Sequence, residues 1–206
     1  MIGKWKKLGI LVGLILFNFN AKNSVASVQC DEGRFDPETS RGKVYSFSLN
    51  KVCYFDQIET VSLQGRFKML MEENPHITIH RVTEKEFTHD MSGYSIELEE
   101  RVKTEHGRME VRAVAKLMSN NVDTFVYDYE AIDITGSGHA ANTQYTHERS
   151  YLEHENNKWK LTITKDIKVL KPWIAPKSIF IKEVQKGMQN NMKKVVEKNI
   201  KIIEAT

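Results

Sequence analysis

Polar side chains with the potential for anion binding or acid–base chemistry concentrate in residues 142–153. Alternate side chains of a strand point to opposite faces, so this stretch offers two polar sets. The sets are Tyr145, His147, Arg149 and Tyr151, and Gln144, Thr146, Glu148 and Ser150. Either set facing inward would line a cavity wall, and Arg149 is the best partner for a carboxylate or phosphate. The alternative is that these residues face water or pair across neighbouring strands.

His147 is the candidate for general acid–base catalysis, with Asp128 or Glu130 from an adjoining strand as its partner. Charged pairs on a solvated sheet face explain the same residues equally well. The sequence has no G-x-S-x-G, Walker or G-x-G-x-x-G motif, so hydrolase, phosphate-loop and dinucleotide-binding sites lack support. We expect no cofactor.

A metal site is not predicted, although the chain has seven histidines. His76 and His80 are four residues apart, but Pro75 and the β-branched residues 77–79 indicate a strand. In a strand this spacing separates the two side chains by about 13 Å, which is too far for one ion. No H-E-x-x-H motif is present.

The N-terminus has the three-part layout of a secretory signal peptide. Lys4, Lys6 and Lys7 precede an apolar stretch over residues 8–19, and Ser24-Val25-Ala26 is a small-x-small cleavage pattern. We therefore predict a signal peptide over 1–26 and an exported, periplasmic or secreted protein. An uncleaved membrane anchor is the alternative, but the apolar stretch is short for a membrane span.

The net charge of the mature chain argues against nucleic-acid binding. Removing residues 1–26 takes away four lysines and no acid, which leaves 26 basic and 27 acidic residues. The remaining concentration of lysine lies on the polar face of the last predicted helix. That face is either simply solvated or makes contact with an anionic membrane surface.

Two cysteines, Cys30 and Cys53, remain after cleavage. An even number of cysteines in an exported protein permits a disulfide, and two free thiols are the alternative. A bond would tie the N-terminal arm to the body of the domain.

The elements that would position these residues are a run of strands and one long helix. Residues 27–43 are polar and rich in turn formers, which predicts an irregular arm, and residues 44–206 form the domain. Residues 56–73 predict one or two short helices that end before Pro75. Alternating strands separated by tight turns then predict an antiparallel meander through residues 77–170.

The C-terminal stretch predicts a strand, a proline-bounded corner and an amphipathic helix that ends near residue 203. In residues 158–170 one parity is apolar except for Lys165, which marks a bulge or an inward-facing polar group. Pro172 and Pro176 bound the corner. The helix has one apolar stripe and needs a sheet to cover it, which gives an α+β fold with a curved antiparallel sheet around the helix.

The order of these elements resembles the helix-grip fold of the START-like (SRPBCC) superfamily, which includes polyketide cyclase-like proteins and plant lipid-binding allergens. The resemblance covers residues 44–203. It rests on the exit Asn74-Pro75-His76-Ile77, the meander, and Ile167-Lys168-Val169-Leu170-Lys171-Pro172-Trp173 before the last helix. It implies a tunnel between sheet and helix that holds a hydrophobic or amphipathic small molecule. The charged segment 88–107 departs from the usual pattern, and no family acid–base pair is matched.

We therefore expect a non-enzymatic binding protein for a lipid-like or aromatic molecule. The alternatives are a cyclase or hydrolase that uses the same cavity and a protein with a filled core that acts through its surface. The expected lining is Phe125, Tyr127, Tyr129, Tyr145, Ile163, Ile167, Trp173, Phe180, Val184 and Met188, with Arg149 as the polar anchor.

Overall fold

The computed structural model describes residues 28–204, apart from 38–39, 41, 56–70, 73, 105–106, 121–122 and 157. The predicted signal peptide lies outside the described residues. So do the predicted short helices over 56–73, except for Met71 and Glu72, which are helical.

The described strands form one antiparallel sheet in the order β1-β3-β9-β8-β7-β6-β5-β4, with β2 also paired to β3. Consecutive strands from β4 to β9 are neighbours, as expected of a meander. Their bounds are β1 Gln29–Cys30, β2 Arg34–Pro37, β3 Val44–Phe55, β4 Ile77–Thr88, β5 Met91–Thr104, β6 Gly107–Ser119, β7 Thr124–Gly136, β8 Thr143–Glu155 and β9 Lys158–Leu170. The short 3₁₀ helix η1, Gly138–Asn142, connects β7 and β8.

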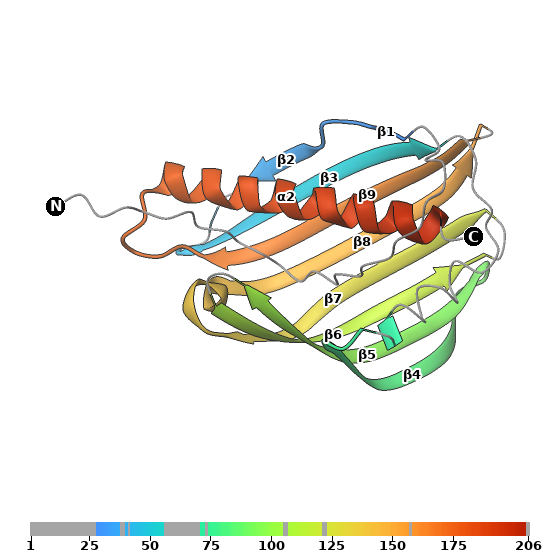
Figure 1. Cartoon of the computed structure of the whole chain (residues 1–206), viewed down its shortest axis with the longest axis horizontal. Coiled ribbons are helices and arrows are strands. Elements are labelled where there is room, and N and C mark those ends of the chain that lie inside the picture. Colours follow the sequence, from blue (N-terminus) through green and yellow to red (C-terminus); the bar gives the residue numbers. More distant parts are fainter. Residues whose placement is uncertain are drawn as a thin grey trace.

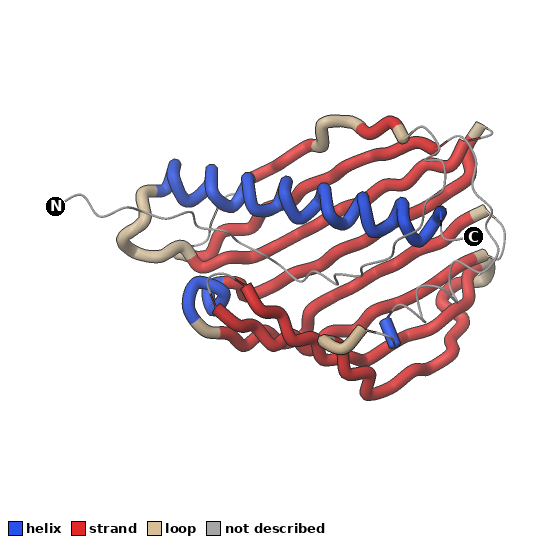
Figure 2. Tube along the Cα trace, viewed as in Figure 1, coloured by secondary structure: helices blue, strands red, loops and turns tan. Residues whose placement is uncertain are grey.

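The sheet curves around α2, Lys177–Glu204, which lies across one of its faces (Figures 1 and 2). We call the face toward α2 the inner face and the opposite face the outer face. The predicted α+β helix-grip fold, with a curved antiparallel sheet and a long C-terminal helix, is confirmed. Among the described residues, no helix is long and apolar enough to cross a membrane.

Alternation of side chains along the strands decides what each face contains. In β9 every odd-numbered residue from Trp159 to Val169 is buried, and the predicted apolar side of the strand is the inner face. On α2 the buried apolar stripe is Phe180, Val184, Met188, Met192, Val195 and Val196. Tyr45 and Phe47 of β3 pack against Phe180, which fixes the start of the helix on the sheet. The core thus lies between the inner face and α2.

We expected the arm over 27–43 to be irregular, but part of it forms two short strands. β1 and β2 both pair antiparallel with β3 along one edge of the sheet. The polar, turn-rich composition of the arm hid these strands, because backbone hydrogen bonds to an open edge do not require an apolar pattern. Cys30 and Cys53, which are opposite each other in the β1–β3 register, are joined by a disulfide.

Candidate functional site

A polar cluster lies inside the otherwise apolar layer between the inner face and α2. Its centre is Lys165 of β9, whose exposed fraction is 2 %. The Lys165 ammonium donates to Glu148 Oε2 of β8 at 2.9 Å and to Asn191 Oδ1 of α2 at 2.6 Å. The neighbouring inward positions of β9, Ile163 and Ile167, are fully apolar and buried. One cation is therefore held by groups from a neighbouring strand and the covering helix.

Two further contacts extend the buried polar groups along the same layer. Asn199 of α2 is buried and its side-chain amide donates to Ser150 Oγ of β8 at 3.5 Å and to the Val195 carbonyl at 2.9 Å. Thr146, which has the same parity as Ser150, is also buried. The set Thr146, Glu148 and Ser150 is thus the one that β8 turns toward the helix.

The tyrosines of β7 border this cluster. Tyr129 donates its hydroxyl hydrogen to Glu100 Oε2 of β5 at 3.1 Å, and both residues are buried. Burial, reinforced first by Glu148 and then by Glu100, raises the pKa of Tyr127 well above its ordinary value. Burial and then Glu100 do the same to the pKa of Tyr129. Both phenols are therefore protonated, neutral groups at physiological pH.

Most of the predicted lining residues do meet in the inner layer. Those that are buried there, from β7, β9 and α2, are Phe125, Tyr127, Tyr129, Ile163, Ile167, Phe180, Val184 and Met188. The structure thus brings together the apolar residues that the strand and helix periodicities had placed on one side.

Trp173 does not join this layer. Its side chain is 85 % exposed in the turn between β9 and α2. The turn is closed on its polar side by the Lys171 ammonium, which donates to the carbonyls of Pro172 and Ala175. The indole ring is consequently directed to solvent and away from the core.

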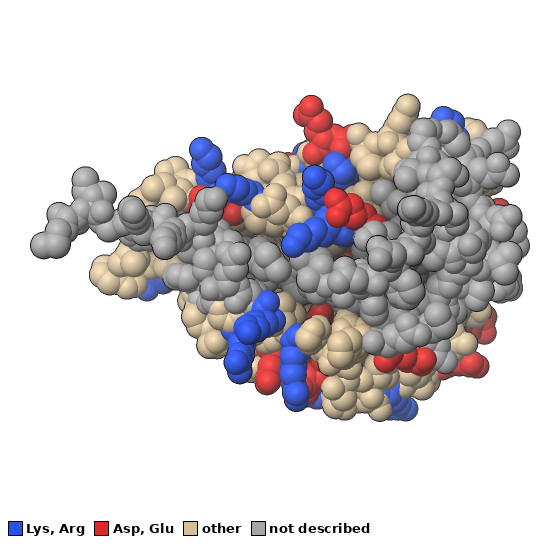
Figure 3. All heavy atoms as spheres, viewed as in Figure 1, with Lys and Arg blue, Asp and Glu red and all other residues tan. Residues whose placement is uncertain are grey.

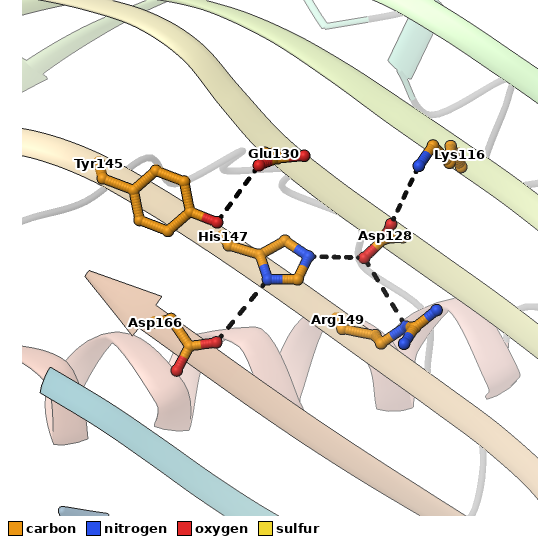
Figure 4. A network of polar contacts seen from close by, with 7 residues as sticks. All are labelled: Lys116, Asp128, Glu130, Tyr145, His147, Arg149 and Asp166. Carbon is orange, nitrogen blue, oxygen red and sulfur yellow. Dashed lines mark hydrogen bonds and ion pairs between the residues drawn. The ribbon is translucent and has the colours of Figure 1, made fainter. Parts of the chain in front are cut away.

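The other set of β8, which includes Tyr145, His147 and Arg149, lies on the outer face, so Arg149 cannot anchor a ligand between sheet and helix. His147 and Asp128 do converge, with Nε2 and Oδ1 2.7 Å apart (Figure 4). Their side chains are only 26 % and 12 % exposed, and both belong to the outer-face parity.

Charged neighbours complete this outer network. Asp128 also approaches Lys116 and Arg149 at 3.7 Å, and His147 Nδ1 lies 3.7 Å from Asp166 Oδ2. Glu130 accepts a hydrogen bond from Tyr145 at 3.3 Å, whereas the close carboxylate partner of His147 is Asp128. Burial and then Glu130 raise the pKa of Tyr145. The arrangement is that of cross-strand ion pairs on an outward sheet face, which orient and neutralise one another.

Three buried polar residues of the inner layer escaped the sequence reasoning: Glu100, Asn191 and Asn199. Each had a signal. Glu100 shares its parity with Ile96, Leu98 and Val102, which are buried on β5. Asn191 and Asn199 lie three and four residues after Met188 and Val195, and so on the apolar stripe of α2. Within the described ranges, no cluster of three histidine, cysteine or acidic side chains is arranged to hold a metal ion.

A scan against protein-family models finds no match for this sequence, and a search of curated proteins finds none either. Similar solved structures exist. TTHA0849 from Thermus thermophilus is 11% identical, with 77% of this chain and 97% of that chain covered and a TM-score of 0.47.

The di-domain ARO/CYC protein BexL from the BE-7585A biosynthetic pathway is 13% identical over 78% of this chain and 51% of that chain, with a TM-score of 0.46. Human STARD10 is 11% identical over 81% of this chain and 73% of that chain, with a TM-score of 0.37. These identities are low, and the predicted helix-grip fold is confirmed by the curved sheet and α2 themselves.

Proposed function

We propose that the protein is an exported carrier that binds an amphipathic small molecule between the inner face and α2. The apolar part of the ligand would replace or separate the side chains of the core, and its polar group would meet Lys165. This function needs no cofactor and no catalytic residue. The disulfide between Cys30 and Cys53 supports export, because such bonds persist in oxidising compartments.

The observation that carries the proposal is the ion pair of the buried Lys165 with the largely buried Glu148. Burying two charges costs more free energy than an apolar pair of the same size, so such a pair is weak evidence for a role in stability. Here Lys165 lies between Ile163 and Ile167 on β9, Glu148 faces it from β8, and the Lys165 ammonium is also bonded to the covering helix. A polar anchor in an apolar, covered layer is the arrangement that small-molecule sites use to orient a ligand.

The charges around Lys165 favour a particular kind of polar group. Its ammonium has three donors, and Glu148 and Asn191 take two of them. Glu148, 2.9 Å away, already neutralises the cation and would repel a second carboxylate. We therefore infer an uncharged acceptor such as a hydroxyl or carbonyl oxygen on a long apolar molecule.

Ligand uptake tests the carrier function directly. The mature protein would be incubated with a mixture of fatty acids, fatty alcohols and sterols and then separated from excess lipid. Its mass would be measured by native mass spectrometry. We expect bound alcohols or other neutral amphiphiles in preference to fatty acids. A protein mass with no adduct, before and after incubation, would show instead that the core is filled and that the protein acts through its surface.

The anchor is tested with a variant that removes both charges, Lys165→Met with Glu148→Met, so that no lone charge is left in the core. We expect this variant to lose its preference for ligands with a polar acceptor. Lys168→Met is the matched control, because Lys168 lies on the same strand but is exposed on the outer face. His147→Gln should likewise leave uptake unchanged, because His147 lies on the outer face; a loss there would mean that the outer network contributes to the binding site.

Export is tested separately by expression of the full sequence in a bacterial host, fractionation and N-terminal sequencing. We expect the protein in the periplasm or medium, beginning at Ser27. A full-length chain that sediments with the membranes would favour the uncleaved anchor.

A further inference from the structure

Exposed apolar side chains gather at the end of the molecule where β9 gives way to α2. Trp173, Ile174 and Ile179 are 85 %, 54 % and 55 % exposed. They are half of the six large apolar residues that are exposed among the described residues, and they fall within seven positions of one another. We call residues 171–182 the tip. Such a local concentration marks a surface that contacts something other than water.

The tip presents these side chains on a fixed backbone. The Ala175 amide donates to the Pro172 carbonyl at 3.1 Å, which closes a turn with Trp173 and Ile174 at its centre. The Lys171 ammonium binds the carbonyls of Pro172 and Ala175 at 3.0 and 2.7 Å. The Phe180 amide donates to the Pro176 carbonyl, so α2 begins immediately afterwards. The apolar side chains are therefore held outward before any partner arrives.

The charge of the tip is positive throughout. Between Asp166 and Glu183 the chain has four lysines and no acid. Lys177 and Lys182 are exposed, and the first turn of α2 contains no acidic residue. A helix N-terminus already carries partial positive charge and ordinarily attracts acids. Lysines added at this position, beside exposed apolar residues, favour an anionic partner.

In Figure 3 the visible described atoms at this end of the molecule are mainly uncharged, with basic and acidic side chains nearby. Tryptophan is enriched at membrane–water interfaces, where its ring is amphipathic. Apolar insertion combined with lysine attraction is how peripheral proteins bind anionic bilayers. An acidic protein surface would complement the same charges, and the vesicle test distinguishes it from a bilayer.

We propose that the tip docks the protein on an anionic phospholipid surface. Trp173 and Ile174 enter the interface, Ile179 packs beside them, and Lys177 and Lys182 contact the headgroups. This site shares Lys182 with the lysine-rich polar face of α2 that the sequence alone had suggested, but its other residues lie before that face begins. The proposal is independent of the carrier function, since it requires no ligand between sheet and helix.

Vesicle flotation tests the docking with the mature protein. Vesicles of phosphatidylcholine alone would be compared with vesicles that also contain phosphatidylglycerol. We expect binding to the anionic vesicles that weakens as salt is added. Trp173→Ser should lower the partition coefficient about tenfold or more, because the apolar insertion is lost. The matched control is Ile132→Ser, which removes a 61 % exposed apolar side chain from β7 instead.

The lysines are tested one at a time. Lys177→Gln and Lys182→Gln should each weaken binding about fivefold, the effect of one lysine near an anionic surface. Lys186→Gln and Lys193→Gln, exposed farther along α2, should weaken it much less. A larger loss with this second pair would assign docking to the polar helix face and overturn the proposal.

Fluorescence gives a readout that distinguishes insertion from adhesion. The mature chain has two tryptophans, and Trp159 is buried in the core. A blue shift on addition of vesicles, quenched by brominated lipid and absent in Trp173→Ser, is the expected result. The proposal is wrong if the emission does not move, or if sedimentation shows that Trp173→Ser merely dissociates a dimer.

Discussion

The contact between Lys165 and Glu148 is where a single residue has the largest consequence. Lys165→Met leaves Glu148 with its cation removed in a largely buried position, so we expect the free energy of unfolding to fall by about 3 kcal/mol. Adding Glu148→Met should recover most of the loss, because an apolar pair needs no charge compensation. Urea unfolding of the wild type, both single variants and the double variant measures the coupling free energy between Lys165 and Glu148. If the two single losses simply add, the two groups do not act as a pair.

The buried phenols of β7 should make the free energy of unfolding decrease at alkaline pH. The pKa of Tyr127 is raised in the folded protein, so above about pH 10 the unfolded chain releases protons that the folded chain keeps. The unfolded state then binds fewer protons, and the free energy of unfolding falls as pH rises. Tyr127→Phe should make this decline shallower in urea titrations at increasing pH. Tyr54→Phe, an exposed replacement, controls for the loss of a hydroxyl; equal slopes for both variants would contradict the expectation.

At the scale of elements, periodicity predicted the strands and the long helix because burial of one face imposes a period of two or 3.6 residues. It also identified Lys165, since a charge on an apolar parity is conspicuous. It could not orient β8, because both of its parities are polar and only pairing with β7 and β9 decides between them. Asn191 and Asn199 escaped because only apolar residues were counted in the stripe of α2, whereas position on the helix determines what a side chain contacts.

We expect the attachment of β1 to the sheet to depend on the disulfide more than on strand pairing. β1 has only two residues, and Cys30 is bonded to Cys53 across 23 positions of sequence. Replacing both cysteines by alanine should lower the free energy of unfolding by about 3 kcal/mol, as expected for a loop of this length. Hydrogen exchange should show faster exchange in β1 and β2 than in β9. Unchanged stability, with reduced wild type behaving in the same way, would mean that strand pairing alone holds the arm.

For the whole molecule, the two proposed surfaces lie at different places on one helix and should fail independently. The polar anchor meets α2 at Asn191, whereas the tip consists of the turn before α2 and its first residues, Lys177 to Lys182. The protein-mediated transfer of a pyrene-labelled long-chain alcohol between anionic donor and acceptor vesicles tests both surfaces in one experiment. The rate of transfer reports docking, and the bound fraction at equilibrium reports ligand binding. Trp173→Ser should slow the transfer about tenfold through weaker docking while the bound fraction at equilibrium stays the same. Lys165→Met with Glu148→Met should lower the bound fraction and leave vesicle flotation unchanged. If each variant impaired both measurements, ligand and membrane would share one site, and the tip would be its entrance.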